Sequence, residues 1–373
     1  MESNPLKRLA ALGQSVWLDY IRRRLIQSGE LKRMIDGDGL RGMTSNPAIF
    51  EKAIAGSRDY DADIREMSRR QQDAFAIYEA LSVRDVQDAA DEFQTVYAAS
   101  DGRDGYVSLE VNPHLAHDTA GTVDEARRLW AAVNRPNVMI KVPATSEGLP
   151  AIRRLTGEGI NVNVTLLFGL PRYEEVVEAY CEGLEARLAE GQPMDRVASV
   201  ASFFVSRIDT LVDSLLEQRI GQDGPQAGIG QALLGEVAVA SAKLAYQRYK
   251  ERFGSDRFRV LARQGARTQR LLWGSTSTKN PNYSDVKYVE ALIGPDTVNT
   301  MPRETFDAYR DHGRPAVRLE DDLEHARGVL RQLPEVGIDI DRVTQQLEDE
   351  GVEKFNQPFD RLLEGIRNAQ HSE

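Results

Sequence analysis

A lysine near the end of a short apolar run is the residue of this sequence best suited to covalent chemistry. The run 137–143 predicts a buried strand whose branched residues share one face, whereas Met139 and Lys141 point to the other. Burial of an unpaired ammonium costs free energy, and loss of its proton leaves an amine that attacks carbonyl carbons. A lysine that reaches solvent, or that pairs with a carboxylate, is the alternative interpretation.

The apolar runs on either side of this lysine show the same alternation. Their polar residues share the face opposite to the branched residues: Ser108 and Glu110 in the first run, and Asn161, Asn163 and Thr165 in the second. An earlier run, 16–19, alternates in the same way and places Asp19 opposite its apolar residues. Short amides and hydroxyls beside one lysine and two carboxylates indicate a hydrogen-bonded pocket, because a solvent-facing sheet normally carries longer charged side chains.

Strand patterns followed by helix patterns recur along the whole chain, which is typical of parallel βα units. Eight strands are predicted: 16–19, 40–43, 106–111, 138–142, 160–166, 197–203, 270–274 and 297–301. We therefore expect an α/β fold, a single (β/α)8 TIM barrel with additional helices, whose functional residues lie at the carboxyl ends of the strands. A doubly wound open sheet is the competing topology, but no GxGxxG or Walker sequence follows any strand.

The 373 residues are expected to form one barrel domain, 1–373. Helical insertions are predicted near 57–103 and 208–267, and a helical tail over 303–373. A capping box at Thr122–Glu125 predicts the start of a helix, Pro171 marks another, and the Gly-rich stretch 221–230 predicts a mobile loop.

The composition limits the partners of this protein. A net charge of -11 argues against nucleic acid, and no segment has the length and apolarity of a membrane span. A single cysteine, Cys181, suits a reducing compartment, and residues 1–14 lack a signal-peptide core, so we expect a cytoplasmic protein. His114 and His117 lack the spacing of a metal site, and we expect no metal and no cofactor. A monomer and a homodimer are both compatible with the sequence.

Seven segments together resemble the transaldolase family. They are WLD (17–19), GMTSNP (42–47), VSLEV (107–111), MIKVPAT (139–145), NVNVTLLF (161–168), ASFFVSR (201–207) and WGSTSTKN (273–280). The resemblance implies a cofactor-free transfer of a dihydroxyacetone unit from sedoheptulose 7-phosphate to glyceraldehyde 3-phosphate, which gives erythrose 4-phosphate and fructose 6-phosphate in the non-oxidative pentose phosphate pathway. Phosphorylated sugars would be its partners.

The resemblance also implies roles for individual residues. Lys141 would form the Schiff base, Glu110 would move protons through a water held with Thr165, and Asp19 would act on the C4 hydroxyl. The implied substrate-binding residues are Asn46, Thr44, Ser108, Asn163, Ser202, Phe204, Arg207, Ser277 and Lys279. Arg207 and Lys279, with Ser277, would hold the sugar phosphate. Pairing of Arg207 with Asp209 or Asp213 is the alternative.

Two positions depart from the family pattern. Lys279 stands where well-known members have arginine, so the bidentate phosphate contact of an arginine is lost, and Phe203 stands where many relatives have proline.

Three other functions stay open. The shorter fructose 6-phosphate aldolase branch of the superfamily carries tyrosine at the position of Phe204. A noncatalytic sugar-phosphate-binding barrel would be expected to lack Lys141, Glu110 or Asp19. A metal-dependent barrel hydrolase would be inhibited by EDTA.

Overall fold

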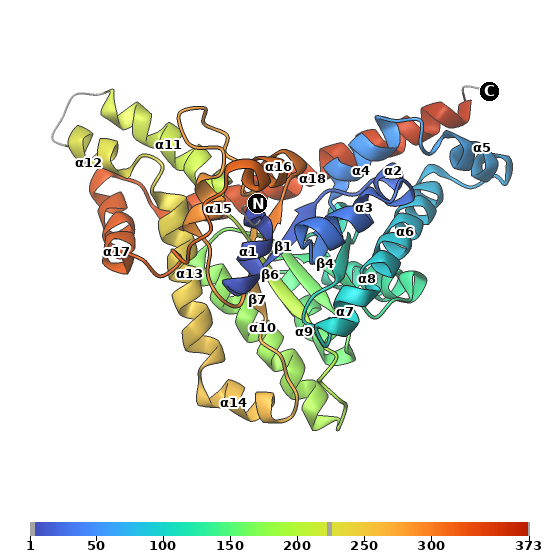
Figure 1. Cartoon of the computed structure of the whole chain (residues 1–373), viewed down its shortest axis with the longest axis horizontal. Coiled ribbons are helices and arrows are strands. Elements are labelled where there is room, and N and C mark those ends of the chain that lie inside the picture. Colours follow the sequence, from blue (N-terminus) through green and yellow to red (C-terminus); the bar gives the residue numbers. More distant parts are fainter. Residues whose placement is uncertain (1–3, 222–225, 372–373) are drawn as a thin grey trace.

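The computed structural model describes residues 4–221 and 226–371, and eight parallel strands form a closed barrel at its centre (Figure 1). Each strand is hydrogen-bonded to the next in chain order, and β8 returns to β1. The strands are β1 Gln14–Asp19, β2 Gly42–Thr44, β3 Tyr106–Glu110, β4 Val138–Pro143, β5 Val162–Leu167, β6 Ser199–Phe204, β7 Arg270–Gly274 and β8 Thr297–Met301. The predicted (β/α)8 barrel is thus confirmed.

Helices surround the barrel and cover the outer faces of its strands (Figure 1). In the described part of the chain the α-helices are α1 Pro5–Ala11, α2 Arg23–Gln27, α3 Glu30–Arg33, α4 Pro47–Phe50, α5 Asp61–Arg69, α6 Ala74–Glu92, α7 Gln94–Ala99, α8 Thr119–Val133, α9 Gly148–Glu158, α10 Leu170–Ala189, α11 Ser206–Ile220, α12 Gln226–Leu233, α13 Val237–Phe253, α14 Asp256–Arg263, α15 Lys287–Ala291, α16 Arg303–His312, α17 Leu323–Gln332 and α18 Ile340–His371. Short π-helices, η1 Met34–Asp38 and η2 Glu51–Ala55, and 3-10 helices, η3 Pro113–Leu115 and η4 Leu333–Val336, complete the helical elements there.

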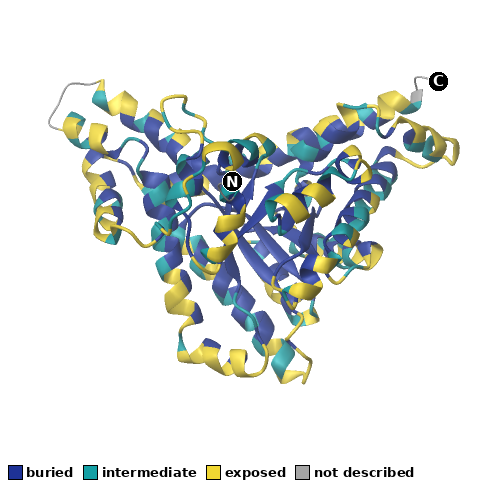
Figure 2. Cartoon of the chain, in the orientation of Figure 1, coloured by how far each residue is buried: buried dark blue, intermediate teal, exposed yellow. Residues whose placement is uncertain are grey.

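Apolar residues on the two faces of the strands belong to two different clusters. Branched residues of the outer faces, such as Val138 and Ile140, belong to the large core that the surrounding helices also form. Figure 2 shows the strands of the barrel as buried. Inward residues of the strands form a separate cluster with Tyr97 of α7 and with Ala198, which directly precedes β6. Its strand members are Trp17, Tyr106, Met139, Val200, Leu272 and Val298. Met139 therefore points inward, and so does Lys141, which the alternation places on the same face two residues later.

A glycine on β2 makes room for the largest residue of this inner cluster. A Cβ atom at Gly42 would lie 2.5 Å from the Trp17 ring, so any other residue would displace the indole. This apolar layer fills the barrel below its carboxyl end, and the polar residues at that end pack on top of it.

A β-bulge interrupts strand β5 at its carboxyl end. The pairing of β5 with β6 shifts between Val164 and Leu167, and Leu166 adopts a left-handed backbone with φ 57°. This region is unfavourable for a branched side chain, and bulges beside functional sites turn neighbouring side chains to a new direction. The bulge directly follows Thr165, the last inward residue of the strand.

Two local predictions were wrong at helix boundaries. Helix α8 begins at Thr119, because the Asp118 side chain accepts a hydrogen bond from Gly121 N, whereas the Thr122 hydroxyl donates to Leu115 O. In the predicted mobile loop 221–230, residues 226–230 belong to helix α12, and residues 222–225 lie outside the described part of the chain.

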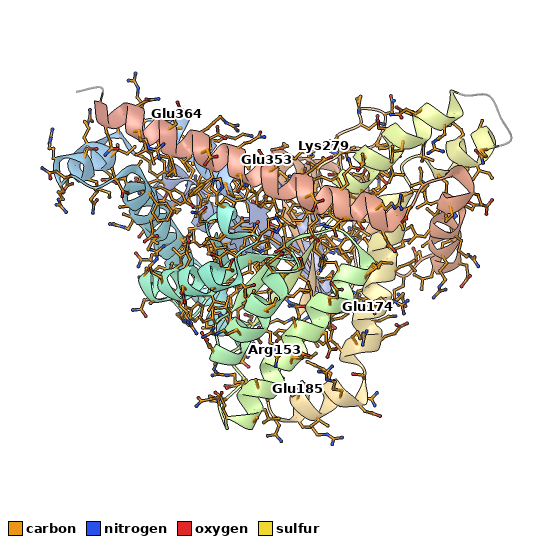
Figure 3. The ribbon with its side chains drawn as sticks, turned by 180° about the vertical axis from the view of Figure 1, so that it is seen from behind. Arg153, Glu174, Glu185, Lys279, Glu353 and Glu364 are labelled. Carbon is orange, nitrogen blue, oxygen red and sulfur yellow. The ribbon has the colours of Figure 1, made fainter. Side chains whose placement is uncertain are left out.

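The long C-terminal helix α18 crosses the carboxyl end of the barrel (Figure 3). It packs against α4, α6, η2, α11 and the end of β5, and its outer face carries exposed residues such as Glu353 and Glu364. The tail therefore returns to the strand ends, where the polar residues of the barrel lie.

Candidate active site

A cavity of about 410 Å³ opens at the carboxyl end of the barrel. Nine of the predicted site residues line it: Asp19, Thr44, Asn46, Lys141, Ser202, Phe204, Arg207, Ser277 and Lys279. The other four, Ser108, Glu110, Asn163 and Thr165, are buried around its base. The structure thus brings together side chains from seven of the eight strands or from the loops that follow them.

Lys141 and Glu110 face each other on adjacent strands, because β3 and β4 pair with these two residues in register. Lys141 Nζ lies 3.1 Å from Glu110 Oε2, and the two side chains are only 5% and 6% exposed. The ammonium also donates a 3.0 Å hydrogen bond to Ser45 O. Lys141 therefore does pair with a carboxylate, as the alternative interpretation of this lysine proposed. The pair lies inside the barrel beside the cavity and not on the protein surface.

The environment of Glu110 makes it suitable for proton transfer at neutral pH. Burial raises its pKa to about 7, against the opposing effect of the Lys141 charge and hydrogen bond. On strand β5, which pairs with the strand of Lys141, the buried Thr165 hydroxyl has no hydrogen-bond partner among the described residues. A buried hydroxyl of this kind is normally satisfied by water or by a ligand.

Asp19 has a hydroxyl partner in Thr44, and Thr300, which was not predicted as a site residue, contacts Thr44 in turn. Thr44 donates a 2.6 Å hydrogen bond to Asp19 Oδ1. Because the only proton of Thr44 is used there, Thr300 must be the donor in the 2.7 Å contact between the two threonine hydroxyls. Burial raises the pKa of Asp19, whereas Lys141, Thr44 and Arg207 lower it. Asp19 is thereby a stronger base than an exposed carboxylate.

A chain of hydrogen bonds crosses the base of the cavity. Ser202 donates to Asn163 Oδ1 at 2.6 Å, and Asn163 Nδ2 donates to Ser108 Oγ at 3.0 Å. Asn163 is also in register with Lys141 on the neighbouring strand. The amide is therefore held in one orientation next to the amine, which suits contact with the hydroxyls of a small polar ligand.

Asn46 and Arg207 each keep a donor for a ligand. The side-chain oxygen of Asn46 caps helix α4 by accepting from Ile49 N at 3.0 Å, so its amide nitrogen remains the donor. Arg207 lies 5.5 Å from the centre of the Phe204 ring, and its buried Nη1 has no partner among the described residues. Burial lowers the pKa of Arg207, a cost that an anion in the cavity would offset.

The alternative partners of Arg207 are used elsewhere. Asp209 accepts hydrogen bonds from Ala238 N and from the Tyr288 hydroxyl. Asp213 accepts from Gly235 N and from the Tyr283 hydroxyl, so the alternative pairing with Arg207 is not observed.

The β7 loop contributes a second basic group to the cavity. Lys279 is exposed and donates a 2.6 Å hydrogen bond to Ser277 Oγ, which places a positive charge and a hydroxyl together at the rim.

Several lining residues were not predicted from the sequence. They include Tyr20, Lys52, Thr300, Arg303, Glu304 and Phe355. The inward alternation of strand β8 could have indicated Thr300, since it lies three residues beyond the start of the strand and faces Thr44. Nothing local indicates Phe355, because it belongs to α18 and reaches the cavity only through the tertiary structure.

The remaining candidates lie outside this cavity. His114 contacts Asp360 at 2.7 Å, and His117 contacts Glu147 at 3.1 Å. Cys181 is free and buried in helix α10, and burial raises the pKa of its thiol to about 11. Within residues 4–221 and 226–371, no group of three His, Cys, Asp or Glu side chains could hold a metal ion, and no helix there could cross a membrane.

A closed (β/α)8 barrel with a buried amine and a carboxylate at its carboxyl end defines a class of proteins suited to carbonyl chemistry. The family model described as "Transaldolase/Fructose-6-phosphate aldolase" matches residues 16–366. The chain belongs to this family.

Named relatives cover nearly the whole chain. A transaldolase of Trichodesmium erythraeum is 50% identical over 98% of this chain and 97% of its own length. Transaldolases of Thiobacillus denitrificans and Mycolicibacterium smegmatis are 48% and 46% identical, over 97% and 98% of this chain and 99% and 98% of their own lengths.

Proposed function

We propose that this protein is a transaldolase of the non-oxidative pentose phosphate pathway. It moves a dihydroxyacetone unit from sedoheptulose 7-phosphate to glyceraldehyde 3-phosphate and forms erythrose 4-phosphate and fructose 6-phosphate. The observation that carries this proposal is the buried pair of Lys141 and Glu110, 3.1 Å apart at the base of a cavity that also contains Asp19 and Arg207. The family and the names of the relatives point to the same reaction.

Lys141 forms the covalent intermediate. Its neutral amine attacks the C2 carbonyl of the ketose, and the resulting carbinolamine loses its C2 oxygen as water, which leaves an iminium ion. Glu110 supplies the proton for this departure and takes a proton from the amine earlier, through a water that the free hydroxyl of Thr165 binds. A carboxyl group with a pKa of about 7 is suited to both transfers.

Asp19 performs the acid-base step at C4. It accepts the C4 hydroxyl proton while the C3–C4 bond breaks, the electron pair moves into the iminium, and the aldehyde product leaves. The enamine that remains on Lys141 then attacks the acceptor aldehyde, and Asp19 returns the proton to the new hydroxyl. Water then adds to the iminium carbon, the carbon-nitrogen bond breaks, and the ketose product leaves while Lys141 regains its amine. The Thr44 and Thr300 hydroxyls hold the carboxylate in position for both directions.

The polar residues around the cavity bind the rest of the substrate. Asn46 and the hydrogen-bonded chain of Ser202, Asn163 and Ser108 contact the hydroxyls of the dihydroxyacetone unit, and Phe204 lies beside them. Arg207, Ser277 and Lys279 hold the phosphate group, which is the only part of the substrate with a full negative charge. We also propose a cytoplasmic location, which the free thiol of Cys181 suits.

A coupled assay with fructose 6-phosphate tests the proposed reaction. Consumption of this sugar only when erythrose 4-phosphate is added indicates transfer. Release of free dihydroxyacetone at the same rate without the acceptor would instead assign the protein to the aldolase branch.

A further inference from the structure

The C-terminal helix α18 is fixed over the barrel by contacts on both sides of the cavity. Glu348 pairs with Arg172 of α10 at 3.1 Å, and both side chains are largely buried. Near the other end of the helix, Arg361 pairs with Glu51 of η2 at 2.6 Å. These contacts hold the middle of α18 in place across the barrel mouth (Figure 3).

A glycine lets this helix approach the strand ends closely. A Cβ atom at Gly351 would lie 3.0 Å from Leu166 Cδ2, which is tighter than ordinary van der Waals contact. Leu166 is the left-handed residue of the β5 bulge, directly after Thr165. The bulge and the glycine therefore fit together, and the next turn of α18 is brought over the base of the cavity.

Phe355 occupies that next turn and lies over the amine. Its ring centre is 5.8 Å from Lys141 Nζ, and the residue is 4% exposed. Both residues line the same cavity. This distance is within the range in which an aromatic face attracts a cation.

We infer that Phe355 controls the fate of the three-carbon enamine by keeping water away from it, and so favours transfer over release. This inference rests on the proposed function. The enamine has two competing reactions: its nucleophilic carbon attacks an aldehyde, or it takes a proton. After protonation, water adds to the iminium carbon, the carbon-nitrogen bond breaks, and dihydroxyacetone leaves while Lys141 regains its amine. Both routes end in hydrolysis of an iminium, so protonation of the enamine carbon is the step that separates them. An apolar ring over the amine disfavours a water that could deliver this proton.

The helix offers a matched control for a substitution at this position. Phe359 is also fully buried on α18, but its ring packs against Phe75, Tyr78 and His114, and it does not line the cavity. Phe355→Leu and Phe359→Leu therefore remove the same ring from the same helix, and only the first changes the surroundings of Lys141. Leucine keeps much of the apolar volume, so the helix should stay docked.

The experiment measures one ratio in each protein. The rate of free dihydroxyacetone formation from fructose 6-phosphate alone is divided by the rate of transfer to erythrose 4-phosphate. A ratio cancels differences in the amount of folded enzyme. We expect Phe355→Leu to raise this ratio several-fold, and Phe359→Leu to leave it at the wild-type value.

The possible results separate this inference from the function on which it rests. Equal ratios in the wild type and in Phe355→Leu would overturn the role of Phe355 alone, provided that the wild type transfers the unit. An equal rise of the ratio in Phe355→Leu and Phe359→Leu would also overturn this role, because the cause would then be weaker docking of the helix. A wild type that neither transfers the unit nor forms a borohydride adduct would overturn the proposed function, and the inference with it.

Discussion

Glu110 Oε2 lies 3.1 Å from Lys141 Nζ because the two residues are paired in register on strands β3 and β4. Any amine displaced along the strand by one residue would point into the outer helical layer. The pair therefore depends on the register of two strands, and its burial raises the pKa of the carboxyl group into the neutral range. Its chemistry can be tested residue by residue.

Lys141→Arg should abolish activity while the fold persists. Arginine keeps the positive charge next to Glu110 but cannot form an imine. Borohydride added with fructose 6-phosphate should inactivate the wild type and leave a reduced adduct on the Lys141 peptide, as read by mass spectrometry. The variant should give no adduct. An adduct on a different lysine would contradict the assignment.

Glu110→Gln should slow imine formation and remove part of its pH dependence. In the wild type, loss of water from the carbinolamine needs the Glu110 proton, so this step should slow as the pH rises through about 7, where the carboxyl group ionises. Glutamine cannot titrate, and its profile should be flat in this region. The rate of single-turnover imine formation, measured from about pH 5 to about pH 9 so that the range spans the pKa of the carboxyl group, tests this. An unchanged profile in the variant would assign the titration to another group.

Asp19→Asn should form the imine but fail to break the carbon-carbon bond. The amide cannot accept the C4 hydroxyl proton, although it can still receive the hydrogen bond from Thr44. Mass spectrometry after borohydride reduction should then show the whole six-carbon sugar attached to the protein. Normal turnover in this variant would show that another group acts at C4.

Arg207→Ala should weaken the binding of phosphorylated substrates selectively. The lost charge-assisted hydrogen bonds correspond to a rise of KM for fructose 6-phosphate of roughly tenfold to a hundredfold. Activity on unphosphorylated fructose serves as the control and should hardly change. Lys279→Ala should have a smaller effect, since that side chain is exposed. If both sugars lost activity equally, the arginine would have a structural role.

Asp209→Asn should make the protein more stable at neutral pH. It should also remove the part of the pH dependence of the free energy of unfolding that the ionisation of Asp209 causes. Burial raises the pKa of Asp209 to about 6 in the folded state, above the value of 3.8 for an ordinary aspartate. The folded protein therefore holds this proton more tightly than the unfolded chain, so its contribution to stability is present at low pH and is lost as the pH rises from about 4 to about 6. The cost at neutral pH is about 3 kcal/mol.

Urea unfolding at several pH values compares the two proteins. The wild type should lose stability over this interval relative to the variant, and the two curves should run parallel above it. Asparagine can still accept the hydrogen bonds from Ala238 N and Tyr288. Parallel curves throughout would show that Asp209 ionises normally.

Local features of the sequence predicted the strands well and the helix boundaries less well. All eight strands lie where alternation placed them, with ends that differ by a few residues, as for β2 at Gly42–Thr44. The capping box at Thr122 misplaced the start of α8, because Asp118 three residues earlier supplies the cap that the helix uses. Asp118 and Thr122 are both suitable N-cap residues, and the sequence alone does not show which of them lies at the end of the preceding loop.

The sequence by itself determined which residues share a face of each strand, because the alternation of side chains is a property of the backbone over a few residues. That is enough to set Lys141, Glu110 and Asp19 apart from the apolar residues around them. Only the tertiary structure decided which face closes inside the barrel, that Lys141 meets Glu110, and that Thr300 reaches Thr44. It also decided that Phe355 lies over the amine. These contacts join residues far apart in the chain, so they depend on strand register and on the docking of α18, which no local pattern specifies.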